Sequence, residues 1–342
     1  MARILLATDA WHPQVNGVVR TLDTTARVLR EMGHVVEVIE PSPYAAIGAP
    51  FYPEIRLCFP RPGRVYDRVR RFRPDFVHIS TEGPIGLLVR RYCQLRGWRF
   101  STSYHTRFPE YLRKLARIPE CLSYGVLRWF HNRATPMMVA TPSLERELKA
   151  RGFTAPVRRW SRGVDLSVFH PRPKVEGPYA RPVLLYVGRV SHEKNVEEFL
   201  KLKTAGTKLI VGDGPARPTL ERKYPEALFL GYRQGVALGE VYAASDLFVF
   251  PSKTDTFGLV VLEALASGLP VAAYPVTGPK DILGESPHPV GALHEDLQVA
   301  ALAALNIDRA GCRPHAETYS WTACAQKFMD NLVPVAGFAL AE

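Results

Sequence analysis

The chain has 342 residues, of which 46% are hydrophobic, and it carries 44 Lys and Arg against 33 Asp and Glu. This length favours two domains, each with its own core. The five cysteines are odd in number and lack metal-ligand spacing, which argues against a disulfide framework and for a reducing cytosol. Because no uncharged apolar run approaches about 18 residues and Met1 leads directly into a predicted strand, we expect neither a membrane span nor a signal peptide.

The excess of positive charge lies in the first half of the chain. Residues 1–170 hold 27 Lys and Arg and 14 Asp and Glu, whereas residues 171–342 hold 17 and 19. Three basic stretches contain apolar neighbours, at 61–73, 87–99 and 107–117. They are either solvated helix faces or attachments to an anionic membrane, near which each basic residue gains about 1 kcal/mol. No nucleic-acid-binding motif accompanies them, so we expect no nucleic-acid partner.

Short apolar runs alternate with amphipathic stretches along the chain, a pattern typical of βαβ units in parallel sheets. The predicted strands of the first half are 4–7, 35–39, 76–79, 100–104 and 137–140, and a helix over 17–32 ends at Gly33. The predicted strands of the second half are 183–187, 208–211, 228–230, 247–250 and 270–274. The pattern therefore predicts an α/β protein.

Four prolines within residues 168–182 predict a linker. We place one domain at 1–171 and a second at 172–318. Residues 319–342 form an amphipathic helix and tail, which would either pack on the first domain or cap the second.

Residues 252–271 are the most informative stretch of the sequence. Asp255 lies in a loop between the strand 247–250 and a helix predicted over 259–266, which Gly268 closes. The N–H groups at the start of that helix form a ready anion site, and Glu263 lies further along it. Two acids beside an anion site suit a sugar nucleotide, since carboxylates accept hydrogen bonds from sugar and ribose hydroxyls.

This stretch resembles the acidic-x7-Glu signature of the retaining glycosyltransferases of family 4. Three other stretches resemble elements of the same family, in the same order: 8–20, 188–195 and 211–215. The resemblance implies the GT-B fold, with two Rossmann-like domains facing a cleft and a C-terminal helix that crosses back to the first domain. One departure is that the first acid is Asp255, where many members carry Glu.

The resemblance also implies roles for individual residues. The expected catalytic residues are Asp255, His105, Arg189 and Lys194. The expected donor-binding residues are Gly17, Gly188, Gly212, Phe257, Gly258, Leu259, Val260 and Glu263. The expected acceptor-binding residues are Asn16, Trp11, Glu82 and Tyr104. On the residues alone, His105 would equally be a structural histidine, and Glu82 would equally cap the next helix.

We expect no metal and no cofactor. The D-x-D pair that holds a metal in GT-A enzymes does not occur, so Arg189 and Lys194 would stabilise the leaving diphosphate instead. The Rossmann dehydrogenase, P-loop, zinc and G-x-S-x-G hydrolase motifs do not occur either.

The segments 8–22, 80–86 and 101–111 resemble those of sulfoquinovosyl- and glucuronosyl-diacylglycerol synthases, and also those of GDP-mannose-dependent α-mannosyltransferases. The resemblance thus implies transfer of a hexose or hexuronic acid, with retention, from a UDP-sugar to a lipid such as diacylglycerol. A GDP-mannose-dependent mannosyltransferase is the alternative, and a catalytically silent carbohydrate- or lipid-binding relative is the third. We expect a cytoplasmic protein, peripheral on the inner face of the cytoplasmic membrane, with Trp98, Phe72 and Leu112 dipping into an anionic leaflet.

Overall fold

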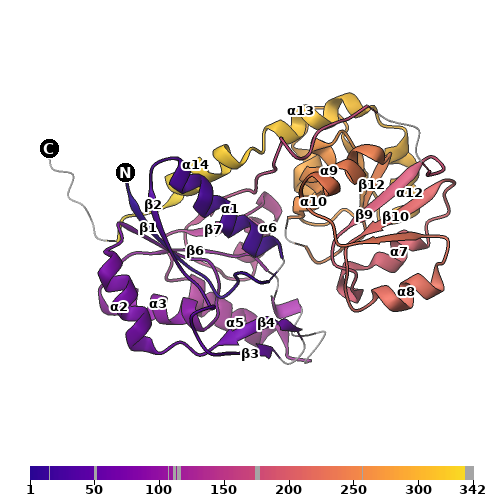
Figure 1. Cartoon of the computed structure of the whole chain (residues 1–342). Helices are drawn as coiled ribbons and strands as arrows, with labels where there is room; N and C mark the ends of the chain where they lie inside the picture. Colours follow the sequence, from indigo (N-terminus) through magenta and orange to yellow (C-terminus); the bar gives the residue numbers. More distant parts are fainter. Residues whose placement is uncertain are drawn as a thin grey trace. The chain divides into compact units, whose positions relative to one another are not determined.

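The computed structural model describes residues 1–14, 16–49, 52–106, 108–110, 113, 117–173, 178–255 and 257–335 (Figure 1). The chain forms two compact units, each built around a six-stranded parallel sheet. Unit 1 comprises residues 1–161 and 321–342, and unit 2 comprises residues 162–320.

The sheet of unit 1 has the strand order β2-β1-β5-β6-β7-β8. Its strands are β1 (Arg3–Ala7), β2 (Val35–Ile39), β5 (Phe76–Ile79), β6 (Ser101–Ser103), β7 (Met137–Val139) and β8 (Val157–Arg159). A separate antiparallel hairpin is made of β3 (Ala46–Ala49) and β4 (Tyr52–Cys58). This hairpin was not predicted from the sequence.

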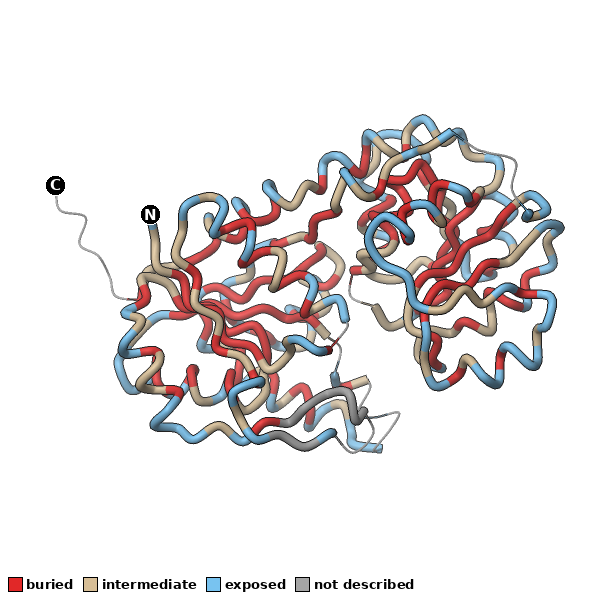
Figure 2. Tube along the Cα trace, in the orientation of Figure 1, coloured by how far each residue is buried: buried red, intermediate tan, exposed pale blue. Residues whose placement is uncertain are grey.

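Helices cover both faces of this sheet. One layer contains α2 (Pro62–Phe72), α3 (Pro84–Leu95), α5 (Glu120–His131) and α6 (Pro142–Ala150). The opposite layer contains α1 (Gly17–Glu31) and α14 (Trp321–Asn331). The side chains of β1 alternate between the two cores: Leu5 belongs to the first, and Ile4 and Leu6 belong to the second. Figure 2 shows the buried strands between exposed outer helix faces.

The C-terminal helix α14 belongs to unit 1. Cys324 and Phe328 of α14 are buried in one apolar cluster with Leu22 and Leu29 of α1. The chain therefore returns to its first unit, as the expected fold class requires.

The sheet of unit 2 has the strand order β11-β10-β9-β12-β13-β14. Its strands are β9 (Val183–Val187), β10 (Thr207–Val211), β11 (Leu228–Gly231), β12 (Leu247–Phe250), β13 (Val271–Ala273) and β14 (Gly291–Leu293). Its helices are α7 (Val196–Leu200), α8 (Arg217–Lys223), α9 (Gly235–Ala244), α10 (Leu259–Ala266), α11 (Pro279–Gly284), α12 (Leu297–Leu305) and α13 (Cys312–Glu317), with 3₁₀ turns η1 (His192–Lys194) and η2 (Arg309–Gly311). Every residue of β9 is buried, as expected of a strand covered on both faces.

Unit 2 begins earlier in the chain than the boundary expected near residue 172. Phe169 is 1% exposed and packs its ring 5.5 Å from that of Tyr242. The Arg313 guanidinium donates to the carbonyl oxygens of Phe169 (2.6 Å) and Ala266 (3.1 Å). These contacts fix the segment before the proline-rich linker to unit 2. Linker residues 174–177 lie outside the described residues.

The glycine expected to end α10 does so. Gly268 has φ +75°, and the Leu269 N–H donates to the Ala264 carbonyl at 2.9 Å. All five cysteines are free thiols. Within the described ranges, the structure contains no helix with the length and apolar character needed to cross a membrane.

Candidate active site

The strand order of unit 2 reverses between β9 and β12. From β9 the chain adds β10 and β11 on one side of the sheet, and then β12, β13 and β14 on the other. In such sheets, ligands bind in the crevice at the carboxyl ends of the strands where the order reverses. The loop after β9 carries Arg189 and Lys194, and the loop after β12 carries Asp255. The topology therefore gathers three of the expected catalytic residues at the position where this fold binds ligands.

Lys194 and Asp255 form an ion pair across this crevice. The distance from Lys194 Nζ to Asp255 Oδ1 is 2.5 Å, and each side chain is 23% exposed. Burial raises the pKa of Asp255, but the charge and hydrogen bond of Lys194, with a bond from Ser252, hold that pKa below its ordinary value. Asp255 is therefore ionised at neutral pH and faces a cation.

Two further bonds hold the loops after β9 and β12 together. The Thr254 hydroxyl donates to the Glu193 carbonyl at 3.3 Å, and the Asn195 amide donates to the Pro251 carbonyl at 3.3 Å. Asn195 has φ +57°, a left-handed conformation that Asn tolerates better than most residues. The ion pair thus lies on loops whose backbones are fixed to each other.

Tyr186 supports the backbone beside Arg189. Its phenol donates to the Arg189 carbonyl at 2.8 Å. Burial, followed by the nearby charges of Asp255 and Glu193, raises the pKa of Tyr186 well above its ordinary value, so the phenol stays a neutral donor. Arg189 itself is half-buried at this edge of the sheet.

The two expected donor glycines of this edge pack against each other. Gly212 has φ +134°, and a Cβ there would lie 1.9 Å from the Gly188 carbonyl oxygen. The Gly188 N–H donates to the Val211 carbonyl at 3.0 Å. Any side chain at position 212 would separate the loops after β9 and β10, so its glycine has a structural reason in addition to the expected approach of a donor.

The N-terminus of α10 opens onto the same edge. Gly258, with φ +90°, precedes the helix, and among the described residues no side chain caps its first N–H groups. Phe257 is 6% exposed, whereas Leu259 and Val260 are half-buried. The backbone of these expected donor-binding residues therefore presents N–H groups suited to an anion.

Glu263 lies deep in unit 2. It is 2% exposed, and the Tyr242 phenol donates to its Oε2 at 3.0 Å. Tyr242 thereby orients the carboxylate expected to bind ribose. Tyr242 was not predicted as a site residue, because a tyrosine on that helix face has the pattern of an ordinary core residue.

The sheet of unit 1 also reverses its order, between β1 and β5. Asp9, after β1, accepts bonds from the N–H groups of Ile85 (2.8 Å) and Gly86 (3.2 Å) and from the Thr81 hydroxyl (2.9 Å). Burial raises the pKa of Asp9, although these bonds act in the opposite direction. Asp9, which was not among the predicted site residues, is thus the residue that caps α3.

Glu82 follows β5 and points to a different partner. Its Oε1 lies 2.9 Å from Nε2 of His131, which is fully buried. The His131 Nδ1 lies 2.9 Å from the Thr102 hydroxyl. Since Asp9 caps α3, the helix-cap role considered for Glu82 is filled, while its action on an acceptor stays a prediction.

The structure separates His105 from Tyr104. His105 follows β6 at the carboxyl edge, is 9% exposed, and has its ring 5.9 Å from that of Trp160. Tyr104 is 1% exposed and packs among core rings, 6.1 Å from Phe153. The Tyr104 ring is therefore part of the core of unit 1 in this structure, and its contact with an acceptor stays a prediction.

The loop after β1 holds the remaining expected residues. The Asn16 side chain accepts bonds from the N–H groups of Val18 and Val19, both at 3.0 Å, and so caps α1. Gly17 is the exposed first residue of that helix, and Trp11 is half-buried. In this structure the Asn16 oxygen is engaged by the helix and not directed at an acceptor.

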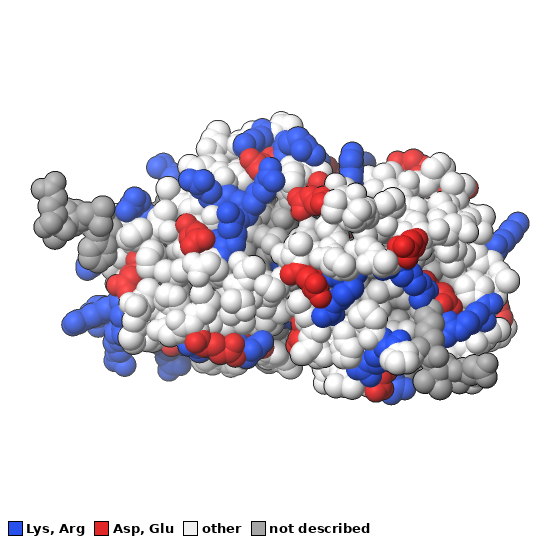
Figure 3. Space-filling view, turned by 90° about the horizontal axis from the view of Figure 1, so that it is seen from above, with Lys and Arg blue, Asp and Glu red and all other residues white. Residues whose placement is uncertain are grey.

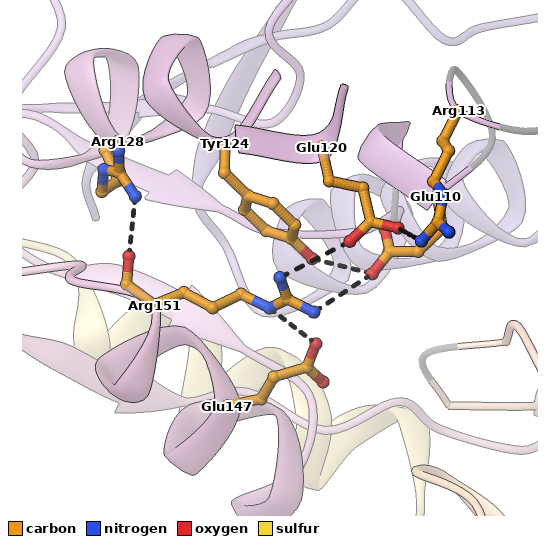
Figure 4. Close-up of polar contacts among 7 residues, drawn as sticks. All are labelled: Glu110, Arg113, Glu120, Tyr124, Arg128, Glu147 and Arg151. Atoms are coloured by element: carbon orange, nitrogen blue, oxygen red, sulfur yellow. Dashed lines mark hydrogen bonds and ion pairs between the residues drawn. The ribbon is translucent and has the colours of Figure 1, made fainter. Parts of the chain in front are cut away.

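A charged cluster anchors the segment that follows His105 (Figure 4). The Arg151 guanidinium contacts Glu147 at 3.1 Å and both Glu110 and Glu120 at 3.8 Å, and it lies 4.1 Å from the centre of the Tyr124 ring. The Tyr124 phenol donates to Glu110 at 2.8 Å. These contacts join the segment at Glu110 to α5 and α6.

The basic stretches of unit 1 are partly occupied by internal contacts. Arg68 donates to Glu37, at 2.5 Å and 3.2 Å, and Arg90 is 3% exposed. Burial lowers the pKa of Arg90 from its ordinary value. Figure 3 shows other Lys and Arg side chains gathered at the left-hand end of the view, on unit 1. Arg71 and Arg73 are exposed.

The apolar residues expected to enter a membrane are mostly engaged elsewhere. The Arg3 guanidinium covers the Phe72 ring, 4.6 Å from its centre. Trp98 packs its ring 5.5 Å from that of Tyr92, against the core. Leu112 lies outside the described residues. Phe72 and Trp98 therefore serve the packing of unit 1.

Comparisons with known proteins show the family to which this chain belongs. Residues 15–168 match the model of glycosyltransferase family 4, and residues 181–307 match that of group 1 glycosyl transferases. The sulfoquinovosyl transferase SQD2 of Arabidopsis thaliana is 31% identical over 362 residues, covering 93% of the chain and 70% of the relative. The chain belongs to glycosyltransferase family 4.

Other relatives bear names that refer to different substrates. A GDP-mannose-dependent α-mannosyltransferase of Mycobacterium tuberculosis is 31% identical over 318 residues, covering 85% of the chain and 83% of the relative. The α-monoglucosyldiacylglycerol synthase of Streptococcus pneumoniae is 25% identical over 315 residues, covering 80% and 71%.

Solved glycosyltransferases share the fold. The sucrose-phosphate synthase of Thermosynechococcus elongatus superposes with a TM-score of 0.75 at 18% identity, covering 96% of the chain and 97% of that structure. Anabaena HepE in complex with UDP-glucose gives a TM-score of 0.70 at 15% identity, covering 96% and 99%. The predicted GT-B fold is confirmed.

Proposed function

We propose that the protein is a retaining glycosyltransferase that moves a hexose or hexuronic acid from a UDP-sugar to a membrane lipid such as diacylglycerol. The observation that carries the transfer chemistry is the Lys194–Asp255 pair, held at the β9/β12 crevice beside the uncapped N-terminus of α10.

In this proposal, charge on the leaving diphosphate is stabilised by the protein alone. Arg189, Lys194 and the first N–H groups of α10 would surround it with positive charge fixed before the reaction begins. Asp255 would accept hydrogen bonds from hydroxyls of the donor sugar, and Glu263 from the ribose. Arg and Lys substitute here for a metal, so transfer would need none.

The ion pair also explains how Asp255 stays ionised next to a negatively charged donor. Lys194 lies 2.5 Å from Asp255 and would lie between the carboxylate and the diphosphate. A single ammonium has three donors, enough to serve both anions at once. Without it, two negative groups would meet in a partly desolvated site, at a considerable electrostatic cost.

Two observations support a lipid acceptor. The loops 8–22 and 80–86 of unit 1 resemble those of glycolipid synthases, and one relative bears a diacylglycerol glycoside in its name. The mannosyltransferase relatives support the second candidate, a GDP-mannose-dependent α-mannosyltransferase acting on a lipid or glycan. In either case the basic unit 1 would hold the protein at an anionic membrane surface.

A donor and acceptor screen tests the proposal. The purified chain would be incubated with UDP-glucose, UDP-glucuronate, UDP-galactose or GDP-mannose, with and without diacylglycerol in anionic vesicles. The proposal predicts that a UDP-sugar is consumed when diacylglycerol is present, in EDTA as well as in buffer, and that the product is an α-glycoside. Use of GDP-mannose alone would favour the second candidate, and a requirement for added metal would overturn the proposed role of Arg189 and Lys194.

A further inference from the structure

Helix α5 exposes an apolar stripe on its outer side. Leu122, Val126 and Trp129 follow the i, i+4, i+7 spacing of one helix face and are 63%, 62% and 57% exposed. The opposite side of the helix, including Leu127 and Phe130, is buried in the core of unit 1. A helix that is apolar on both sides normally has a partner on each of them.

Helix α3 contributes exposed apolar residues next to this stripe. Its outer side carries Leu87 and Leu95, which are 39% and 68% exposed. The buried Arg90 of α3 donates to the Trp129 carbonyl at 2.8 Å, and its guanidinium lies 3.9 Å from the centre of the Trp129 ring. The two helices therefore lie side by side, and their outer sides form one surface, which we name the α3–α5 face: Leu87, Leu95, Leu122, Val126 and Trp129.

The surroundings of the α3–α5 face are positively charged. Arg91, Arg96 and Arg133 are exposed, and the sequence of α3 contains no acidic residue. The only acid of α5, Glu120, is engaged by Arg113 at 3.0 Å. An apolar surface bordered by arginines complements a bilayer with anionic head groups, which offers both an apolar interior and negative charge.

We propose that the α3–α5 face is the surface by which this protein lies on an anionic lipid bilayer, with Leu122, Val126 and Trp129 entering between the head groups. Tryptophan suits that depth, because its ring is apolar and its N–H stays close to water. The inference deepens the proposed function, on which it rests, by naming the side of unit 1 that a lipid acceptor would approach. Helix α5 follows the His105 loop, so its N-terminal end lies toward the edge where the candidate acceptor residues end their strands.

Vesicle binding tests this inference without any donor. The wild-type chain and the variant Leu122→Gln/Val126→Gln would be sedimented with vesicles of equal parts phosphatidylcholine and phosphatidylglycerol. Losing two inserted apolar side chains should weaken binding about tenfold or more. The matched control is Val299→Gln/Leu302→Gln on α12 of unit 2, where two apolar residues are also exposed (44% and 50%). The control should bind as the wild type does.

Insertion depth gives a second readout. With vesicles whose acyl chains carry bromine, the tryptophan emission of the wild type should be quenched, and Trp129→Phe should lose most of that quenching. The charged border is tested by Arg91→Gln/Arg133→Gln, which should reduce the preference for anionic over pure phosphatidylcholine vesicles.

Several results would overturn the inference: unchanged vesicle binding of Leu122→Gln/Val126→Gln, equal loss in the α12 control, or quenching that survives Trp129→Phe. A wild-type dimer that the α5 variant converts to a monomer would assign the face to a second copy of the chain instead. The vesicle assay contains no nucleotide sugar, so it tests membrane binding separately from sugar transfer. If the proposed function were wrong but this inference right, the chain would bind vesicles and yet consume no donor.

Discussion

The Lys194–Asp255 pair makes a quantitative prediction about stability. Exposed ion pairs couple by about 0–1 kcal/mol, and removing one partner of a fully buried pair costs about 3–5 kcal/mol. With both side chains 23% exposed and 2.5 Å between the charged atoms, Lys194→Met should cost about 2 kcal/mol at pH 7. The double variant Lys194→Met/Asp255→Asn should cost less than the sum of the single changes, because it leaves no lone charge.

The effect of pH follows from the lowered pKa of Asp255. A carboxyl group whose pKa is lower in the folded chain contributes stability above the unfolded pKa, about 4, and this contribution is lost as pH falls through the folded pKa. The difference between wild type and Lys194→Met depends on the pKa of Asp255 in the two folded chains. It should be largest at neutral pH, begin to shrink as pH falls through the pKa of Asp255 in the variant, and be lost below the lowered pKa of the wild type. In Lys194→Met, burial of Asp255 is no longer offset, so the pKa of Asp255 should rise above its ordinary value.

The sequence offers a way to follow each unit separately. All five tryptophans lie in unit 1, so tryptophan fluorescence reports that unit, whereas circular dichroism reports both. Lys194→Met should lower the melting temperature seen by circular dichroism by about 4–8 °C, and Lys280→Met, which removes an exposed lysine of α11, should not. A coupling energy below about 0.5 kcal/mol in the double-mutant cycle would refute the argument.

Three further perturbations test other contacts. Gly212→Ala should disrupt the loops after β9 and β10 and abolish UDP binding measured by calorimetry. The control Gly284→Ala, whose Cβ meets nothing within 4 Å, should leave UDP binding intact. Equal UDP binding by both variants would contradict the proposed packing of Gly212 against Gly188. Glu82→Ala should destabilise unit 1 by about 1–3 kcal/mol in fluorescence-detected melting, because the buried His131 loses its acceptor, and Glu82→Gln should recover most of this loss. Arg189→Ala should raise the KM for the donor and lower kcat with no rescue by Mg²⁺, and rescue by the metal would contradict the assigned role of the guanidinium.

The central strands of both sheets were predictable from the sequence, since strands such as β9 and β12 are continuous apolar runs between turn residues. Of the four edge strands, β2 and β11 were predicted, but β8 and β14 were not. β8 reads Val-Arg-Arg and β14 reads Gly-Ala-Leu, and neither has the hydrophobic pattern of a strand; their pairing with β7 and β13 defines them. The hairpin β3–β4 was missed as well.

The pairing of Lys194 with Asp255 was predictable in part, because residues at the carboxyl ends of neighbouring parallel strands meet at one edge. The residues that hold the site in place were not. Tyr242 and Asp9 act through partners distant in sequence, and their own spacing carries no signal of that contact. Tyr186 contacts the nearby Arg189, but in the sequence it reads as an ordinary apolar residue of a buried strand. The same holds for Trp98, which was expected to enter a membrane but packs against Tyr92 of α3. The exposure of Trp98 depends on that packing, which its place in the sequence does not reveal.

The turnover of Asp255→Asn, compared with its affinity for UDP, tests the central claim most directly. If Asp255 contacts the donor sugar, the variant should lose about two orders of magnitude or more in transfer, as is typical when a group acting in the transition state is removed. Its affinity for UDP, which has no sugar at that position, should stay close to that of the wild type. Transfer within a few-fold of the wild type, or loss of UDP binding in step with transfer, would contradict the assignment of Asp255 to the sugar.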